Sequence, residues 1–275
     1  MKITLVQSRG IVNDPKVNFF KARMRINNID SEMFIFPEMF CSGYVSDPSA
    51  MKLDFLKTLV IDDMAKLSDN KGSTIICGCP RKDGDKVYDS LAVIDGKETS
   101  YYDKIHLSKT GVFDETAVFT PGSTPMIVDR QGLKMGMCVG HDLFVSDLLE
   151  YYAENSADLI ICITALLPEQ IDGFLKVAQS SAIKFSIPIL ICNMTGPDCG
   201  QEMGGKSAYI DEKGNFVETC TTGSDVREVR IDVAALNANT ASRVIPPKID
   251  FGGCASVQIK VTEPDPNGPF CPFSG

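Results

Sequence analysis

The sequence predicts a single large α/β domain, and three observations support this. Short β-rich runs alternate with amphipathic helical stretches along most of the chain. Several β-rich runs are continuously apolar, as expected of strands covered on both faces. The chain has 275 residues, 44% of them hydrophobic, which is enough for a deep core. With no internal repeat and no linker, the strands outnumber the helices in this one domain.

The expected strands combine apolar and β-branched residues between turn signals. In chain order they are 2–7, 33–38, 73–79, 88–95, 99–104, 125–129, 133–140, 158–164, 187–193 and 206–211. Two polar stretches, "DGKE" at 95–98 and "DEKG" at 211–214, are typical of turns.

Helical spacing predicts helices over 15–28, 53–69, 145–155 and 168–185. In the last of these, apolar residues recur at steps of three or four: Ile171, Phe174, Leu175, Ala178, Ala182 and Phe185. The stretch 244–275 is rich in Pro and Gly, and we expect an extended arm there over the surface or a partner. We therefore divide the chain into a domain, 1–243, and a C-terminal tail, 244–275.

Charge and hydropathy exclude several classes of partner. The net charge is −9, and an anionic surface repels the phosphate backbone of nucleic acids. The start, "MKITLVQ", lacks the longer apolar core of a signal peptide. No apolar stretch approaches the roughly 18 residues that a membrane helix needs. The sequence thus predicts a cytoplasmic protein that binds neither nucleic acid nor membrane.

The ten cysteines do not form a disulfide or zinc pattern. Cys77, Cys79, Cys138, Cys162 and Cys192 lie inside apolar runs, where a free cysteine packs as a small hydrophobic residue. The "CGC" at 77–79 is not a zinc-ligand spacing, and no second Cys/His cluster accompanies it. We expect reduced thiols and no metal site.

Polar residues end several of the predicted strands, where the chemistry of an α/β sheet usually gathers. Glu38 ends the strand "MFIFPE", and Lys104 ends "TSYYDK". Glu115 follows in the loop "GVFDETAVFTPG", and the strand "LKMGMCV" runs into "GHD" at 140–142. One such residue marks only the point where a strand meets water. Four such positions in one chain favour a common site.

These motifs resemble those of the nitrilase (carbon–nitrogen hydrolase) superfamily over about residues 1–235. The family's F-P-E strand end with a following G-Y is similar to "IFPEMFCSGY", and its lysine motif to "YDKIHL". Its second glutamate, ahead of T/E-P-G, is similar to Glu115 in "ETAVFTPG". Its late strand and turn resemble "GKSAYIDEKG" at 205–214.

The resemblance implies a four-layer α-β-β-α sandwich, with two sheets face to face and helices outside. It implies pairing as a homodimer or higher homo-oligomer through 145–155 and 168–185, with the tail reaching across. It implies neither a metal nor an organic cofactor.

The resemblance also implies roles for individual residues. In the family a cysteine thiolate attacks an amide or nitrile carbon. Glu38 would act as general base and acid, and Lys104 with the backbone N–H of His141 would stabilise the oxyanion. Glu115 would position Lys104 or the substrate. The side chains expected to contact the substrate are Tyr44, His141 and Asp142.

The family's nucleophile motif places Gly140, and not a cysteine, at the nucleophile position. The motif's Arg and Pro are also absent, and Lys184 stands at a glutamate position of a later helix. Cys138 lies two residues upstream, about 6.5 Å away along a strand, whereas a nucleophile needs a reactive distance of about 3–3.5 Å. A thiol buried among apolar side chains is also inert. We therefore interpret Cys138 as core packing.

Three interpretations remain, and they leave turnover open. In the first, a modified site with Glu38, Lys104 and Glu115 binds a small amide, nitrile, amine or carboxylate. It then acts on a non-peptide carbon–nitrogen bond, as hydrolase or transferase, without a covalent thioester. In the second, the chain is a pseudoenzyme for binding or assembly. In the third, it is an amidase that uses a displaced Cys138. His141 is interpreted as a satisfied imidazole, because no serine is paired with it.

Overall fold

The computed structural model describes residues 1–44, 53–109 and 114–245 of the chain. The predicted tail, 244–275, lies outside the described residues except for Val244 and Ile245. Within 1–245 the chain forms one compact unit. Among the described residues, none of the helices combines the length and apolar character needed to cross a bilayer.

The first sheet has six strands in the order β14-β1-β2-β3-β4-β5. Parallel pairing joins β1 to β2 and β2 to β3, and the remaining pairs are antiparallel. The strands are β1 (Lys2–Gln7), β2 (Met33–Ile35), β3 (Thr74–Asp83), β4 (Lys86–Asp95), β5 (Glu98–Asp103) and β14 (Asp225–Arg230).

The second sheet also has six strands, in the order β13-β12-β9-β8-β7-β6. Its centre, β7-β8-β9, is parallel. The strands are β6 (Ile127–Arg130), β7 (Leu133–Val139), β8 (Leu159–Thr164), β9 (Ile189–Asn193), β12 (Ala208–Ile210) and β13 (Phe216–Thr219). A separate hairpin pairs β10 (Thr195–Asp198) with β11 (Gln201–Gly204).

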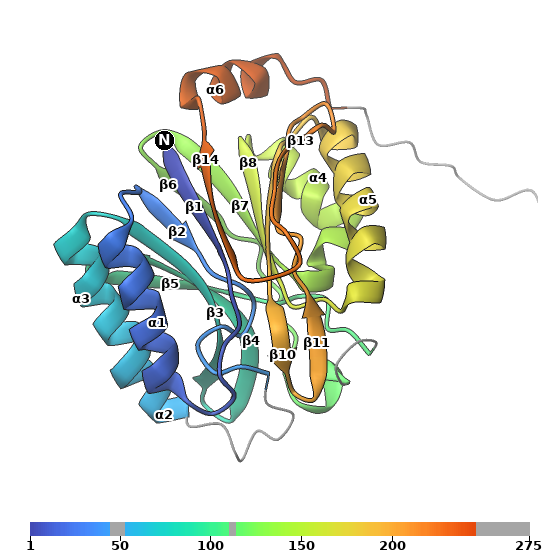
Figure 1. Ribbon diagram of the computed structural model, residues 1–275. Coiled ribbons are helices and arrows are strands. Elements are labelled where there is room, and N and C mark those ends of the chain that lie inside the picture. The colour runs from blue at the N-terminus through green and yellow to red at the C-terminus, as the bar shows by residue number, and fades with distance from the viewer. Residues whose placement is uncertain (45–52, 110–113, 246–275) are drawn as a thin grey trace, which may run out of the picture. The chain divides into compact units, whose positions relative to one another are not determined.

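Helices flank the two sheets on their outer sides (Figure 1). The first sheet carries α1 (Pro15–Asn28), α2 (Leu53–Leu56), a π-helical turn η2 (Lys57–Ile61) and α3 (Asp62–Lys71). The second carries α4 (Ser146–Glu154) and α5 (Pro168–Phe185). The remaining helical segments are α6 (Val233–Ser242) and the 3-10 turns η3 (Glu115–Ala117) and η4 (Gly140–Phe144).

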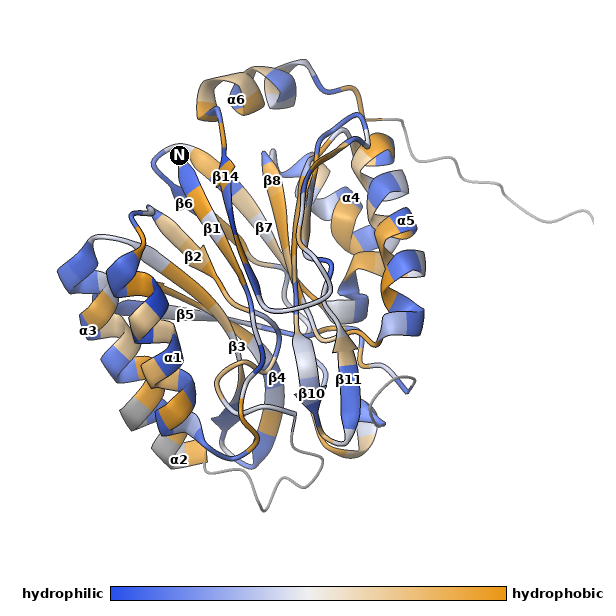
Figure 2. Ribbon diagram, viewed as in Figure 1, coloured by the Kyte–Doolittle hydropathy of each residue, from blue (hydrophilic) through white to orange (hydrophobic). Residues whose placement is uncertain are grey.

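Three of the apolar core clusters form layers between these elements. One cluster fills the space between the two sheets, and the other two pack each sheet against its helices. Strand β7 shows the alternation, because Met137 and Val139 belong to the inner cluster while Cys138 faces α4 and α5. Apolar colouring is concentrated in the central strands, whereas the helices carry polar residues between their apolar ones (Figure 2). The predicted four-layer α-β-β-α sandwich is confirmed.

Candidate active site

A buried lysine joins two glutamates at the ends of different elements. Lys104 follows β5, and its Nζ lies 2.7 Å from Oε1 of Glu38 and 2.8 Å from Oε1 of Glu115. All three residues are buried. The structure therefore brings together the three charged residues that the sequence predicts for one site.

A glycine in β3 lets the Glu38 turn approach the first sheet. A Cβ on Gly78 would lie 2.3 Å from the backbone N of Met39 and 2.5 Å from Cα of Glu38. The N–H of Gly78 donates to the carbonyl of Pro37, and its own carbonyl accepts from the N–H of Cys41. This turn aims the Glu38 side chain at Lys104.

Backbone and side-chain hydrogen bonds hold the other two charged groups. The N–H of Lys104 donates to the carbonyl of Asp89 at 2.8 Å. Oε2 of Glu115 accepts the backbone N–H of Ser108 at 2.8 Å, and the hydroxyl of Tyr44 lies 3.4 Å from Oε1 of Glu115. Tyr44, a predicted substrate contact, thus borders the same cluster.

Gly140 lies at the end of β7, directly against the charged cluster. Its φ of 51° is in the left-handed region, which glycine adopts without a steric penalty. A Cβ built there would lie 2.9 Å from Nζ of Lys104 and 3.3 Å from Oε1 of Glu38. Any side chain at position 140 would therefore point at the lysine and at the base candidate.

Cys138 lies in the core layer between the second sheet and its helices. Its thiol is fully buried with Cys162, and burial raises its pKa well above the ordinary value. Cys162 is the thiol nearer the turn, because its Sγ lies 3.7 Å from the carbonyl oxygen of Gly140. Both thiols are protonated at neutral pH and enclosed by apolar side chains.

Asp142 anchors the segment that follows Lys104. Its Oδ1 accepts the backbone N–H groups of Ile105 and His106, at 3.1 and 2.6 Å. Its Oδ2 accepts the Tyr102 hydroxyl at 2.8 Å and the N–H of Val139 at 3.2 Å. With four donors, the carboxyl ties β7 to the lysine loop. The substrate contact predicted for Asp142 stays a prediction.

The imidazole of His141 is half-buried and packs edge-on against Phe144, with ring centroids 5.3 Å apart. Burial lowers its pKa, and the charge of Lys104 lowers it further. His141 is therefore neutral at pH 7, and its predicted contact with substrate also stays a prediction.

A third carboxyl, on Asp89 in β4, shares the same ammonium group. Its Oδ2 lies 3.5 Å from Nζ of Lys104, and its side chain is wholly buried. Burial alone would lower the pKa of Lys104, but Glu38, Asp89 and Glu115 together raise it well above its usual value. Burial likewise opposes ionisation of Glu38, yet Lys104 and the surrounding hydrogen bonds hold that pKa below its usual value. Lys104 is thus a cation, and Glu38 an anion.

The carboxyls of Glu38, Asp89 and Glu115 each offer an oxygen within 4.8 Å of the others, a spacing that suits a shared cation. Nζ of Lys104 lies 2.7–3.5 Å from all three and supplies that positive charge. A metal ion would have to displace it.

Asp89 is the site residue that sequence reasoning missed. Its signal was an acidic residue at the start of the apolar strand "YDSLAVID", where charge is costly unless it is paired. Its partner is distant in sequence, so only the fold shows the proximity.

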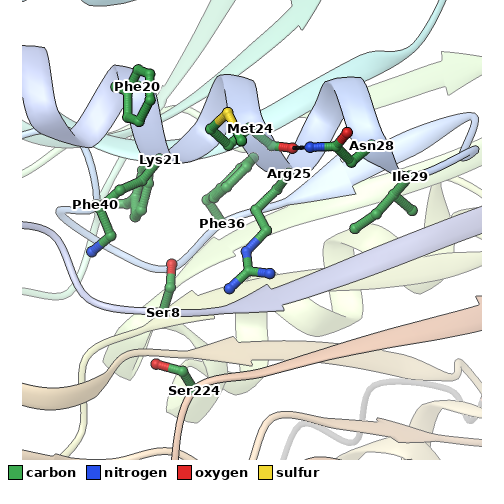
Figure 3. A pocket seen from close by; sticks show the side chains of 10 residues that line it. All are labelled: Ser8, Phe20, Lys21, Met24, Arg25, Asn28, Ile29, Phe36, Phe40 and Ser224. Carbon is green, nitrogen blue, oxygen red and sulfur yellow. Dashed lines mark hydrogen bonds between the residues drawn. The ribbon is translucent and has the colours of Figure 1, made fainter.

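A cavity of about 390 Å³ lies beside α1 and is distinct from this cluster. It combines apolar side chains such as Met24 and Phe36 with Lys21 and Arg25. In Figure 3 the Arg25 side chain extends from the helix toward the segment that carries Ser8. None of the cluster residues lines this cavity.

Comparison with known proteins identifies the family. The family model described as carbon–nitrogen hydrolase matches residues 2–239. The chain belongs to the carbon–nitrogen hydrolase family. Among curated proteins, this chain is 27% identical over 227 residues to the glutamine-dependent NAD(+) synthetase of Thermotoga maritima. That alignment covers 79% of this chain but only 39% of the synthetase.

Two further relatives match most of their own length. A hydrolase in the agr operon of Staphylococcus lugdunensis is 26% identical to this chain, over 76% of this chain and 91% of that protein. The solved structure of the NitN amidase from Nesterenkonia sp. AN1 superposes with a TM-score of 0.77 at 21% identity, over 86% of this chain and 95% of that one. This likeness shows the shared fold. Another structure of that amidase shows acrylamide added to its active-site cysteine.

Proposed function

We propose that this protein binds a small amide, amine or carboxylate beside Lys104 and acts on its carbon–nitrogen bond without a covalent thioester. One observation carries the proposal: a Cβ at Gly140 would point between Lys104 Nζ, at 2.9 Å, and Glu38 Oε1, at 3.3 Å. A water molecule or a substrate nucleophile at that point would lie within hydrogen-bonding reach of the base.

The charges of the cluster match the steps of an amide hydrolysis. Water attacks the carbonyl carbon while the Glu38 carboxylate takes a proton from it. Lys104 and the backbone N–H of His141 stabilise the oxyanion that forms. When the carbon–nitrogen bond breaks, Glu38 returns the proton to the leaving amine. Glu115 holds Lys104 in place throughout.

The alternative amidase route, through Cys138, has less support. That thiol is fully buried in a layer packed by α4 and α5, and its pKa is raised. Attack needs a thiolate at about 3–3.5 Å from the carbon.

A second candidate function is binding or assembly without turnover. Gly140 at the nucleophile position favours it, because loss of a nucleophile usually costs orders of magnitude in rate. In both functions we propose a homodimer that pairs through α4 and α5, in the cytoplasm, where cysteines stay reduced.

Ammonia release from a panel of small amides and nitriles tests the hydrolytic proposal. We expect slow release by the wild-type chain and none by Glu38→Gln. The matched control is Glu98→Gln, at an exposed glutamate of β5, which should behave as wild type. Release that survives Glu38→Gln would rule out Glu38 as the base.

Thermal unfolding with the same panel, extended to amines and carboxylates, tests binding by itself. A ligand that binds only the folded chain raises the melting temperature once its concentration exceeds Kd. A shift without ammonia release supports the binding function. The absence of any shift across the panel contradicts small-ligand binding, and with it the hydrolytic proposal.

A further inference from the structure

Asp89 is a buried acid whose oxygens lack hydrogen-bond donors. Its side chain is 0% exposed, and among the described residues neither Oδ1 nor Oδ2 accepts a hydrogen bond. Within the part of the chain that the structure describes, the cation paired with it is Lys104, whose Nζ lies at 3.5 Å, beyond ordinary hydrogen-bond length. Buried carboxylates are usually paired or hydrogen-bonded, so Asp89 requires another explanation.

The neighbouring acids take the available donors. Glu38 and Glu115 lie at 2.7 and 2.8 Å from Nζ of Lys104, and Glu115 also accepts the N–H of Ser108. If all three acids were ionised, three negative charges would face one positive charge in a buried cluster. Like charges this close cannot all ionise in a buried site.

A proton on Asp89 resolves both problems. Carboxyl oxygens of Asp89 and Glu38 lie within 4.8 Å of each other, and a side-chain hydrogen bond links the two carboxyls. Two carboxylates can only accept hydrogen bonds, whereas a protonated carboxyl has the one O–H donor that this bond needs. Asp89 is the acid that takes the proton, because it lies farthest of the three from the Lys104 ammonium and accepts no hydrogen bond from the described residues.

We propose that Asp89 is a neutral carboxylic acid that donates a hydrogen bond to the Glu38 carboxylate and positions it as the base. Its role in positioning a base rests on the proposed function, whereas its protonation does not. Asp89 is a positioning residue, since it acts on substrate only through Glu38.

The electrostatic surroundings agree with this assignment. Burial raises the pKa of Asp89 well above its usual value, and the charge of Glu38 raises it further. Lys104 acts in the opposite direction, and Glu115 adds to the rise. Another titratable group at the cluster, the hydroxyl of Tyr44, is neutral because burial raises its pKa.

Infrared difference spectroscopy tests the protonation without any ligand. At neutral pH, the spectrum of wild type minus Asp89→Asn should contain the carbonyl stretch of a protonated carboxylic acid. The control is Asp225→Asn, at a surface acid whose pKa is lowered, and its difference spectrum should contain only carboxylate bands. Loss of carboxylate bands in Asp89→Asn would overturn the assignment.

The pH dependence of ligand binding or ammonia release tests the positioning role. Asn retains an N–H donor to Glu38, so Asp89→Asn should keep the acidic limb of the wild-type profile. Asp89→Leu removes the donor, which raises the pKa of Glu38 and moves that limb to higher pH. If Asp89 were ionised, both variants would remove a negative charge and move the limb to lower pH.

An acidic limb that moves in neither variant would also overturn the positioning role, because it would leave Asp89 only a structural part. If no ligand binds at all, the proposed function fails, and the infrared result still decides whether Asp89 is protonated.

Discussion

Gly140 is the residue at which a side chain would enter the charged cluster. The residue has a φ of 51°, and its missing side chain faces Lys104 and Glu38. A larger residue there must adopt a left-handed conformation, which costs about 1–2 kcal/mol. It must also shift the lysine by a few tenths of an ångström. Neither cost forbids a cysteine.

The variant Gly140→Cys should therefore acquire a reactive thiol. Its sulfur would lie beside the Lys104 ammonium, which favours the thiolate, and acrylamide or iodoacetamide should modify it stoichiometrically. The wild-type chain is the control, and its buried Cys138 should stay unmodified under native conditions. Mass spectrometry of peptides identifies the labelled position. Rapid labelling of Cys138 in the wild type would contradict its assignment to the core.

Asp89 should make stability depend on pH. The pKa of Asp89 is higher in the folded chain than in the unfolded chain, where it is about 4. Its contribution to stability is therefore fully present below about pH 4, and it is lost as the pH rises toward the pKa of the folded state. The side chain introduced by Asp89→Asn does not titrate. As pH rises above about 4, the free energy of unfolding of this variant should therefore increase relative to that of the wild type by up to about 1.4 kcal/mol per pH unit. Urea unfolding at about pH 4 and pH 7 measures the difference.

The matched control for this series is Asp225→Asn. The carboxyl of Asp225 has a lowered pKa in the folded chain, so it stabilises the fold above its unfolded pKa and not at low pH. At neutral pH the free energy of unfolding of Asp225→Asn should therefore not exceed that of the wild type. If Asp89→Asn instead loses stability relative to the wild type as pH rises, Asp89 is not a neutral acid in the folded chain.

At the scale of elements, a glycine determines how closely α4 packs on β7. A Cβ on Gly136 would lie 2.7 Å from ring atoms of Tyr152, whose side chain is fully buried. The same tyrosine donates a hydrogen bond to the carbonyl of Met137. Helix α4 follows the Gly140 turn directly, so this contact also supports the site.

Gly136→Ala should destabilise the fold by about 1–3 kcal/mol, because overpacking forces a buried ring to move. The matched control is Gly223→Ala, where an added Cβ meets nothing within 4 Å. That change should leave stability unchanged or raise it by up to about 1 kcal/mol. Chemical denaturation of both variants gives the comparison. Equal stabilities would show that α4 moves to accommodate the methyl group.

The apolar pattern predicted most elements but not all of them. The ten expected strands and four expected helical stretches all have counterparts, with ends shifted by a few residues. Strand β14 was missed because its sequence, "DVREVR", carries four charged residues among six. It pairs with β1 along the whole length of that strand, so its strand state comes from backbone pairing. The hairpin β10–β11, β13 and α6 were also missed.

At the scale of the whole molecule, the outer face of α4 and α5 is the expected dimer interface. Exposed apolar side chains lie on α4, α5 and the neighbouring elements: Phe144, Tyr151, Val177, Ile183, Phe216 and Val217. Large exposed apolar groups that gather on one face favour association.

Ile183→Glu should therefore convert the proposed homodimer to a monomer, because Ile183 is 54% exposed and a charge there would be buried on pairing. Phe20→Glu, at a similarly exposed residue of α1, is the control and should leave the dimer intact. Sedimentation analysis of both variants and the wild type measures the mass in solution. A monomeric wild type would contradict the dimer.

The sequence by itself predicted the fold class and the candidate residues Glu38, Lys104, Glu115 and Gly140, because each lies in a local motif at a strand end or in the loop that follows one. Strand periodicity and motif spacing are properties of neighbouring residues, so they can be read without a structure. Only the tertiary structure decided that Asp89 joins the cluster, and that Cys138 faces the helices and not the charged site. Proximity between distant segments and the direction of a side chain both depend on how the two sheets pack, which no local pattern specifies.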